Sequence, residues 1–172
     1  MNRGARCASA SVGLLLLFAL ACGRSDGVAS ERLVRAFDPQ WDVPIQTDAA
    51  SVEGEVWRVA PKFGGSVRLF ELAEPGIEGS VMLIYRAQLR AVDLVAPAYL
   101  EMRVRLPGRG SFFSKGLANP LRGTSEWASY EIPFLLEAAQ IPDLVSLNFT
   151  FEAPGGEVHM RDVAVLAAPL ER

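Results

Sequence analysis

YLEMRVRL, residues 99–106, and VSLNFTFE, residues 145–152, alternate apolar and polar side chains one residue at a time. Successive side chains of a pleated strand point to opposite faces of its sheet, so this two-residue period marks a strand with one buried face and one solvated face. Both stretches are therefore predicted to be β-strands that cover a hydrophobic core. The apolar members are Leu100, Met102, Val104, Leu106, Val145, Leu147, Phe149 and Phe151.

Five further strands are predicted on either side of these two. They lie at residues 56–59, 67–72, 81–90, 130–135 and 157–166. Turn-forming sequences separate them, namely Pro75-Gly76, Pro107-Gly108, Asn119-Pro120 and Pro154-Gly155-Gly156. Many short strands without a long helical pattern favour an all-β fold, a β-sandwich (jelly roll) of two antiparallel sheets.

Two segments depart from this regular pattern. In the last strand Val158 and Met160 share one phase while Val163 and Val165 share the other. A β-bulge near Arg161-Asp162 would keep both pairs inside, because a slip of one residue exchanges the two faces. Residues 29–37 could form one or two helical turns before the sandwich begins.

The first 22 residues have the features of a secretory signal. Arg3 and Arg6 precede an apolar stretch, residues 8–21, that is shorter than a membrane-spanning helix of about 20 apolar residues. A basic start, a short apolar stretch and a small residue before the cut predict removal of residues 1–21. We therefore expect a signal peptide at 1–21, a lipidated tether and lead-in segment at 22–50, and one β-jelly-roll domain at 51–172.

The end of this signal, Ala19-Leu20-Ala21-Cys22, resembles the lipobox of bacterial lipoproteins. The resemblance implies a diacylglyceryl group on Cys22, and several acyl chains hold a protein stably because each buried CH₂ contributes about 0.8 kcal/mol. Gly23 in place of Asp implies the outer membrane. The expected location is the cell envelope, with the domain facing the periplasm or the surface. The alternative is an ordinary signal peptide with an incidental cysteine.

Composition excludes several classes of site. Cys7 leaves with the signal and Cys22 is lipidated, so the mature domain has no thiol for a disulfide or a metal. His159 is the single histidine of the chain, so zinc sites built from His and Cys lack ligands. Loss of Arg3 and Arg6 reduces the 17 basic residues to 15 against 20 acidic ones, which argues against a nucleic-acid binder.

The order of motifs between residues 67 and 166 carries a second resemblance. Strand 99–106 is followed by GSFFS at 110–114, GTSEW at 123–127, YEIPF at 130–134 and GEVHMRDV at 156–163. This order resembles galactose-binding-like jelly rolls of the carbohydrate-binding-module type. The resemblance implies a non-catalytic domain that binds sugars. In many relatives the last strand carries paired acidic residues, one of which can help to hold a structural calcium. Here Arg161 stands before Asp162, so only half of that pair is present.

No catalytic constellation is visible. The lone His159 lies on a predicted strand, where a structural role is the ordinary one. Glu101 and Glu152 could supply the two carboxylates of a glycosidase, yet both are expected at outward, solvated positions. We therefore predict that the protein is not an enzyme and holds neither a metal ion nor a cofactor.

Binding candidates are found on the polar phase of the predicted strands and in one loop. If 81–90 pairs antiparallel with 99–106, then Arg86 and Gln88 lie beside Glu101 and Arg103. Such a row is either a solvated charged face or a polar platform for sugar hydroxyls.

An aromatic contact for a sugar ring is expected from Phe112 or Phe113. The two are adjacent and cannot both point inward on a strand, so one of them is expected to be exposed near a long loop, residues 107–127. Trp127 is expected in the core. Trp57 is a further aromatic candidate.

Two functions follow from these observations. The first is a membrane-anchored, non-catalytic module that binds a glycan of the cell envelope or another carbohydrate. The second is a structural or interaction lipoprotein whose partner is an envelope protein. A hydrolase that uses Glu101 and Glu152 is a third and weaker alternative.

Overall fold

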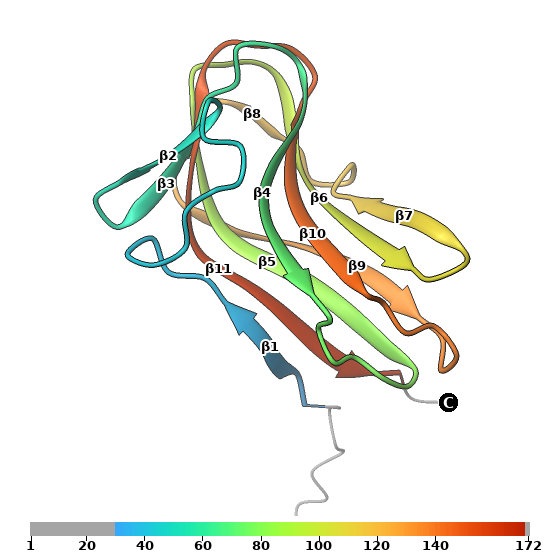
Figure 1. Ribbon diagram of the computed structural model, residues 1–172. Coiled ribbons are helices and arrows are strands. Elements are labelled where there is room, and N and C mark those ends of the chain that lie inside the picture. Colours follow the sequence, from blue (N-terminus) through green and yellow to red (C-terminus); the bar gives the residue numbers. More distant parts are fainter. Residues whose placement is uncertain (1–29, 171–172) are drawn as a thin grey trace, which may run out of the picture.

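A computed structural model describes residues 30–170 as two facing β-sheets (Figure 1). The described residues contain eleven strands and no helix, and every strand pair is antiparallel. The all-β sandwich prediction is therefore confirmed. The strands are β1 (Arg32–Ala36), β2 (Ala50–Glu53), β3 (Val56–Val59), β4 (Gly65–Ala73), β5 (Val81–Val92), β6 (Leu94–Leu106), β7 (Gly110–Lys115), β8 (Leu121–Gly123), β9 (Ala128–Leu136), β10 (Leu144–Phe151) and β11 (Glu157–Pro169).

The two sheets differ in strand number and order. The large sheet has six strands in the order β2-β3-β11-β5-β9, with β1 also paired to β11. The small sheet has five strands in the order β4-β10-β6-β7, with β8 also paired to β6. Strands distant in the sequence are thus neighbours in space, as for β4 and β10, which lie side by side in Figure 1. Residues 30–170 contain no helix long and apolar enough to cross a membrane.

The core lies between the sheets and is built by the alternating residues. Met102, Val104 and Leu147 are fully buried, as the two-residue period predicts. Trp57 joins this core with no exposed surface, and its indole Nε1 donates a hydrogen bond of 2.9 Å to the carbonyl of Asp42. A buried indole needs such an acceptor, so Trp57 is not available to a ligand.

The predicted bulge in the last strand is confirmed. The register of β11 against β5 shifts between Arg161 and Ala164, and Asp162 has a left-handed φ of 51°. Val158, Met160, Val163 and Val165 are all buried as a result. Because of the bulge, the apolar side chains before it and those after it all point into the core.

The segment before the sandwich is a strand and not the helical turns expected over residues 29–37. β1 pairs antiparallel with β11, with Arg35 opposite Val165. A helix of this length is marginal on its own because nucleation is costly, whereas the exposed edge of β11 offers ready hydrogen-bond partners. Residues expected in the lead-in segment thus form part of the large sheet. The signal peptide and Cys22 lie outside the described residues.

The expected pairing of residues 81–90 with 99–106 is wrong. β5 pairs with β11 and β9, while β6 pairs with β10 and β7. One residue, Asp93, joins β5 to β6 with φ 51°, and the chain crosses from one sheet to the other there. At this crossing the Asp93 amide donates a hydrogen bond of 3.0 Å to Thr124 Oγ1. Gly156 packs closely against Asp93, because a Cβ at Gly156 would lie only 2.3 Å from the Asp93 carbonyl oxygen.

Candidate functional site: a polar hollow on the small sheet

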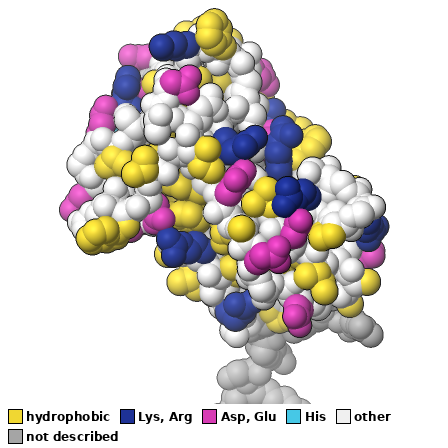
Figure 2. All heavy atoms as spheres, viewed as in Figure 1, with side chains coloured by type: hydrophobic (Ala, Val, Ile, Leu, Met, Phe, Trp, Pro, Cys, Tyr) yellow, Lys and Arg dark blue, Asp and Glu magenta, His cyan; other side chains and the backbone are white. Residues whose placement is uncertain are grey.

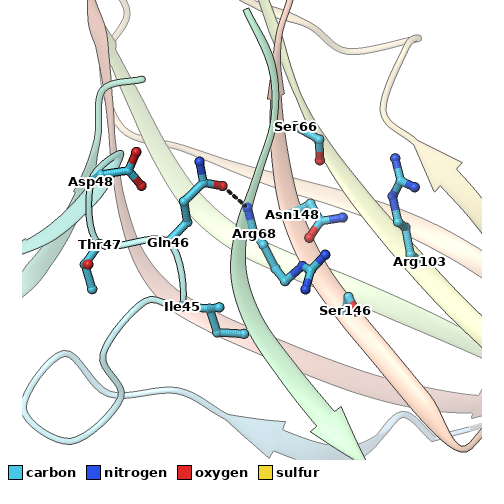
Figure 3. Close-up of a pocket in the computed structure, with 9 residues that line it drawn as sticks. All are labelled: Ile45, Gln46, Thr47, Asp48, Ser66, Arg68, Arg103, Ser146 and Asn148. Atoms are coloured by element: carbon cyan, nitrogen blue, oxygen red, sulfur yellow. Dashed lines mark hydrogen bonds between the residues drawn. The ribbon is translucent and has the colours of Figure 1, made fainter. Parts of the chain in front are cut away.

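The outer face of the small sheet holds a hollow of about 550 Å³ (Figure 3). Its floor comes from three neighbouring strands, β4, β10 and β6, and its wall from the segment before β2. In the space-filling view, basic and acidic side chains gather over these strands (Figure 2). The lining residues are Ile45, Gln46, Thr47, Asp48, Ser66, Arg68, Arg103, Ser146 and Asn148.

The floor follows from strand register. Asn148 on β10 stands opposite Arg68 on β4 and opposite Glu101 on β6. Ser146, two residues along the same face of β10, stands opposite Arg103. Because alternate residues share one face, the polar phase of three strands converges on one surface while the apolar phase fills the core.

The wall is held against the edge of the sheet by backbone bonds. The amides of Ile45 and Gln46 donate to the carbonyls of Leu69 and Arg68 at 2.9 and 3.1 Å. The Gln46 side-chain oxygen accepts the amide of Arg68 at 3.2 Å, which is the dashed line in Figure 3. The segment thus covers the edge of β4 and places Thr47 and Asp48 beside the floor.

Glu101 lies beneath the hollow rather than in solvent. The residue is only 4% exposed. Its Oε1 accepts bonds from Arg103 Nε (2.7 Å), Asn148 Nδ2 (3.2 Å) and Ser66 Oγ (3.2 Å), and its Oε2 accepts from Thr150 Oγ1 (2.9 Å). Burial opposes ionisation, but these donors outweigh it and hold the pKa of Glu101 below its ordinary value. The expectation of a solvated Glu101 is therefore wrong, because its neighbours on three strands cover it.

This carboxylate fixes the orientation of the Asn148 amide. Asn148 is 3% exposed, and its Nδ2 must face Glu101, since the reverse orientation would place two acceptors together. Its Oδ1 is then a buried acceptor without a hydrogen-bond partner among the described residues. An unsatisfied buried acceptor costs roughly 1–3 kcal/mol. Because Asn148 lines the hollow, a donor from a ligand or water that enters there is the candidate partner for this oxygen.

Two guanidinium groups stand over the same floor. The side chains of Arg68 and Arg103 are 60% and 51% exposed. Arg68 Nη1 lies 3.5 Å from Glu71 Oε1, which is an ion pair without close hydrogen-bond contact. Figure 3 shows both arginines on the same side of the sheet, with Asn148 between them in this view.

The structure divides the six predicted binding residues between the two sheets. Glu101, Arg103 and Phe113 belong to the outer face of the small sheet, where Phe113 stands opposite Arg103. Arg86 and Gln88 lie on β5 of the large sheet, since β5 does not pair with β6.

Phe112 stands opposite the inward-facing Val104, so it is on the other phase of β7 from Phe113. Both phenylalanines are nevertheless exposed, by 43% and 66%, because β7 is an edge strand. The prediction of one long loop at residues 107–127 is wrong, because this segment contains β7 and β8. Turn residues at both ends concealed these two short strands.

Other lining residues were not predicted. Ser146 and Asn148 already stood on the polar phase of 145–152, and Arg68 lay in the predicted strand 67–72. Their convergence depends on the order β4-β10-β6, which strand periodicity does not contain. The segment Ile45–Asp48, which forms the wall, does not alternate apolar and polar residues, so the sequence did not predict its role.

The single histidine belongs to a separate network on the large sheet. His159 Nε2 lies 2.7 Å from Glu157 Oε1, and its Nδ1 lies 3.1 Å from Arg90 Nη2. The bond to His159, aided by Arg58, lowers the pKa of Glu157 despite its partial burial. His159 does not line the polar hollow of the small sheet.

Trp127 is half-buried, whereas it was expected to lie in the core. It precedes β9 at the surface, where the guanidinium carbons of Arg161 and Arg90 lie 4.4 and 5.7 Å from its ring centroid. Cation–π contacts of this kind stabilise an aromatic ring at the surface. With two arginines against its ring, Trp127 is poorly placed to stack on a sugar.

The two carboxylates of the hydrolase alternative do not form a pair. Glu101 stands opposite Asn148, and Glu152 follows four residues later, roughly 13 Å along the strand. The carboxyl groups of glycosidases lie about 5–9.5 Å apart, and one has a raised pKa. Glu101 has a lowered pKa, and Glu152 accepts a bond from the Tyr99 hydroxyl. Residues 30–170 also contain no group of three or more His, Cys, Asp or Glu that could hold a metal ion.

Comparison with known proteins identifies the fold. No family model and no curated protein matches the sequence. The CBM22-1 xylan-binding domain from Paenibacillus barcinonensis Xyn10C is similar in structure, with TM-score 0.52 and 11% identity over 84% of this chain and 100% of that domain. A cyclase from Fischerella sp. TAU is also similar, with TM-score 0.49 and 11% identity over 76% of this chain and 74% of that chain. So is the family 29 module CBM29_1 from Piromyces equi, with TM-score 0.46 and 14% identity over 83% of this chain and 92% of that chain. The chain has the β-sandwich fold of carbohydrate-binding modules.

Proposed function

We propose that this protein is a membrane-anchored, non-catalytic module that binds a glycan in the polar hollow of the small sheet. The observation that carries the proposal is Asn148 Oδ1, a buried acceptor without a partner in the described chain, on a residue that lines the hollow and whose Nδ2 is already bonded to Glu101. Sugar hydroxyls are donors that match such an acceptor. The fold supports the proposal only by analogy, because one fold hosts many functions.

The surroundings of Asn148 suit a polyhydroxylated ligand. Ser66, Thr47 and Ser146 offer hydroxyls, and Gln46 and Asp48 offer further polar groups around one hollow. The dimensions are compatible with small ligands, since pockets of 300–1,000 Å³ are usual for them. Phe113, exposed opposite Arg103, provides an apolar surface on the same face for a sugar ring.

The test is glycan binding by the full chain in detergent, first on an array of envelope and plant polysaccharides and then by calorimetry. Asn148→Ala should weaken binding about tenfold or more, because a buried hydrogen bond to a ligand is removed. Asn119→Ala, in an exposed turn away from the hollow, is the matched control and should bind like the wild type. Absence of binding across the array, or wild-type affinity of Asn148→Ala, would contradict the proposal.

The proposed anchor is Cys22, which lies outside the described residues. Acyl chains on this cysteine would place the sandwich at the cell envelope, at the outer membrane by the argument from Gly23. Cys22→Ser should abolish incorporation of a labelled fatty acid and release the protein from the membrane fraction. Cys7→Ser, inside the expected signal, is the control and should leave labelling intact. Labelling of Cys22→Ser at the wild-type level would exclude this attachment site.

If the array is silent, the alternative is a lipoprotein that contacts an envelope protein. Cross-linking in intact membranes then distinguishes the two functions, since an interaction protein should give one dominant cross-linked partner.

A further inference from the structure

We infer that the glycan bound in the hollow carries carboxylate groups, as in a uronic-acid polysaccharide. This inference rests on the proposed function and specifies its ligand class. It comes from the unused donors of two arginines that stand over one polar floor, Arg68 and Arg103.

Most donors of both arginines are unoccupied. A guanidinium group has five N–H donors. Arg103 uses its Nε for Glu101 at 2.7 Å, and its terminal nitrogens make no hydrogen bond to the described residues. Arg68 makes no side-chain hydrogen bond within the described chain, since Glu71 Oε1 is 3.5 Å from its Nη1. Two planar forks therefore face solvent at the same hollow.

The carboxylates near these arginines are buried, are bonded to another side chain, or lie across the hollow. Glu101 is buried under the floor with four donors, and Glu71 accepts a bond from Ser146 Oγ at 3.2 Å. Asp48 lines the opposite wall, and Figure 3 shows it across β4 from Arg103. A ligand thus meets guanidinium donors at one side and an acceptor carboxylate at the other.

This distribution fits a sugar with both hydroxyls and a carboxylate. A guanidinium fork matches the two oxygens of a carboxylate in bidentate geometry, and such charge-assisted bonds are about twice as strong as neutral ones. Asn148 Oδ1 and Asp48 accept from hydroxyls, and Asp48 would repel an acidic group near the wall. The ligand carboxylate is therefore placed over Arg68 and Arg103, with the hydroxyls toward residues 46–48.

The experiment compares acidic glycans with their own neutral derivatives. The full chain is titrated with oligomers of galacturonate, glucuronate and mannuronate, and with the methyl ester of each. The acid form of at least one sugar should bind about tenfold more tightly than its ester at low salt, and added salt should reduce this preference because the contact is exposed.

Variants connect the preference to the two arginines. Arg68→Gln should reduce the preference for the acid form several-fold, and it leaves the Glu101 network intact. Arg103→Lys retains the charge but removes the fork, and should also reduce it. Arg109→Gln, in the exposed turn between β6 and β7, is the control and should bind like the wild type.

The outcomes separate the inference from the proposed function. Binding of esters and acids with equal affinity, or tighter binding of the esters, overturns the inference and leaves glycan binding in place. An acid preference that Arg68→Gln and Arg103→Lys both retain also overturns it. Absence of binding to every form, here and on the polysaccharide array, overturns the proposed function itself.

Discussion

The outer faces of the two sheets are built from the same residue types but differ in how their polar groups are satisfied. On the large sheet Arg86 bonds Glu31 and Glu131 at 2.9 and 2.8 Å, and Glu157 bonds both His159 and Arg58. The charged groups in these two clusters pair with one another. On the small sheet the buried carboxylate of Glu101 accepts four hydrogen bonds, and Asn148 Oδ1 is buried without a partner among the described residues. The guanidinium groups of Arg68 and Arg103 are exposed on the same face.

This difference shows that residue type alone does not identify a site. Arg86 and Gln88 looked as suitable for a ligand as Glu101 and Arg103, and the bonds of Arg86 show that its charge is already used. What distinguishes the small sheet is a buried polar group whose partner is missing beside an open hollow. The large-sheet face also has an unsatisfied buried atom, Arg90 Nε, but Arg90 is packed against the ring of Trp127.

The largest expected effect concerns the buried carboxylate. Glu101→Ala should lower the free energy of unfolding by about 3–5 kcal/mol, because Arg103, Asn148, Thr150 and Ser66 would lose their common acceptor. Chemical denaturation of the full chain in detergent measures this loss.

The matched variant on the large sheet is Glu131→Ala. Its side chain is 54% exposed and Arg86 retains Glu31, so the expected cost is about 0–1 kcal/mol. Equal costs for the two variants would show that the comparison between the faces is mistaken.

A second prediction concerns pH and the same carboxylate. The pKa of Glu101 is lowered below 4.5 in the folded state, so its contribution to stability is fully present above pH 4.5 and is lost as the pH falls through the folded-state pKa. Denaturation midpoints measured from pH 7 downward should decline below pH 4.5. The decline should be shallower in Glu101→Gln, which cannot titrate. An identical slope in the two proteins would assign the decline to other acids, such as Glu157, whose pKa is also lowered.

The sequence predicts features that depend on residues close together in the chain, but not features that depend on which distant strands pair. The strands at 99–106 and 145–152, the core residues on them and the bulge near Arg161-Asp162 follow from local alternation, and the structure contains them. Pairing between strands does not follow from it. The short link at Asp93 resembles a hairpin turn but passes between sheets, and this one error placed Arg86 beside Glu101. Residues 45–48 have no period at all, so only the structure shows them as a wall.

A third prediction uses another buried polar group that has no partner among the described residues. The Tyr85 hydroxyl is fully buried without a partner, and burial strongly raises its pKa. It does not line the polar hollow, in contrast to Asn148. Tyr85→Phe should therefore stabilise the protein by about 1 kcal/mol and leave glycan affinity unchanged, because it removes an unpaired polar atom from the core. A destabilised variant would reveal a buried water that bonds the hydroxyl.

A small effect is expected from loss of the cation–π contact at Trp127, which precedes β9 of the large sheet. Arg161 is 47% exposed and its Nε is 3.8 Å from Asp162, so its main contact is the Trp127 ring. Arg161→Ala should cost about 0.5–1 kcal/mol of stability, the value of an exposed cation–π contact, and should not alter binding to any glycan. Arg68→Gln should do the reverse, with little effect on stability and a clear effect on the affinity for acidic sugars. If Arg161→Ala weakens glycan binding as much as Arg68→Gln does, the large sheet takes part in recognition. Pairing of its charges would then be a poor criterion for a face that does not bind ligands.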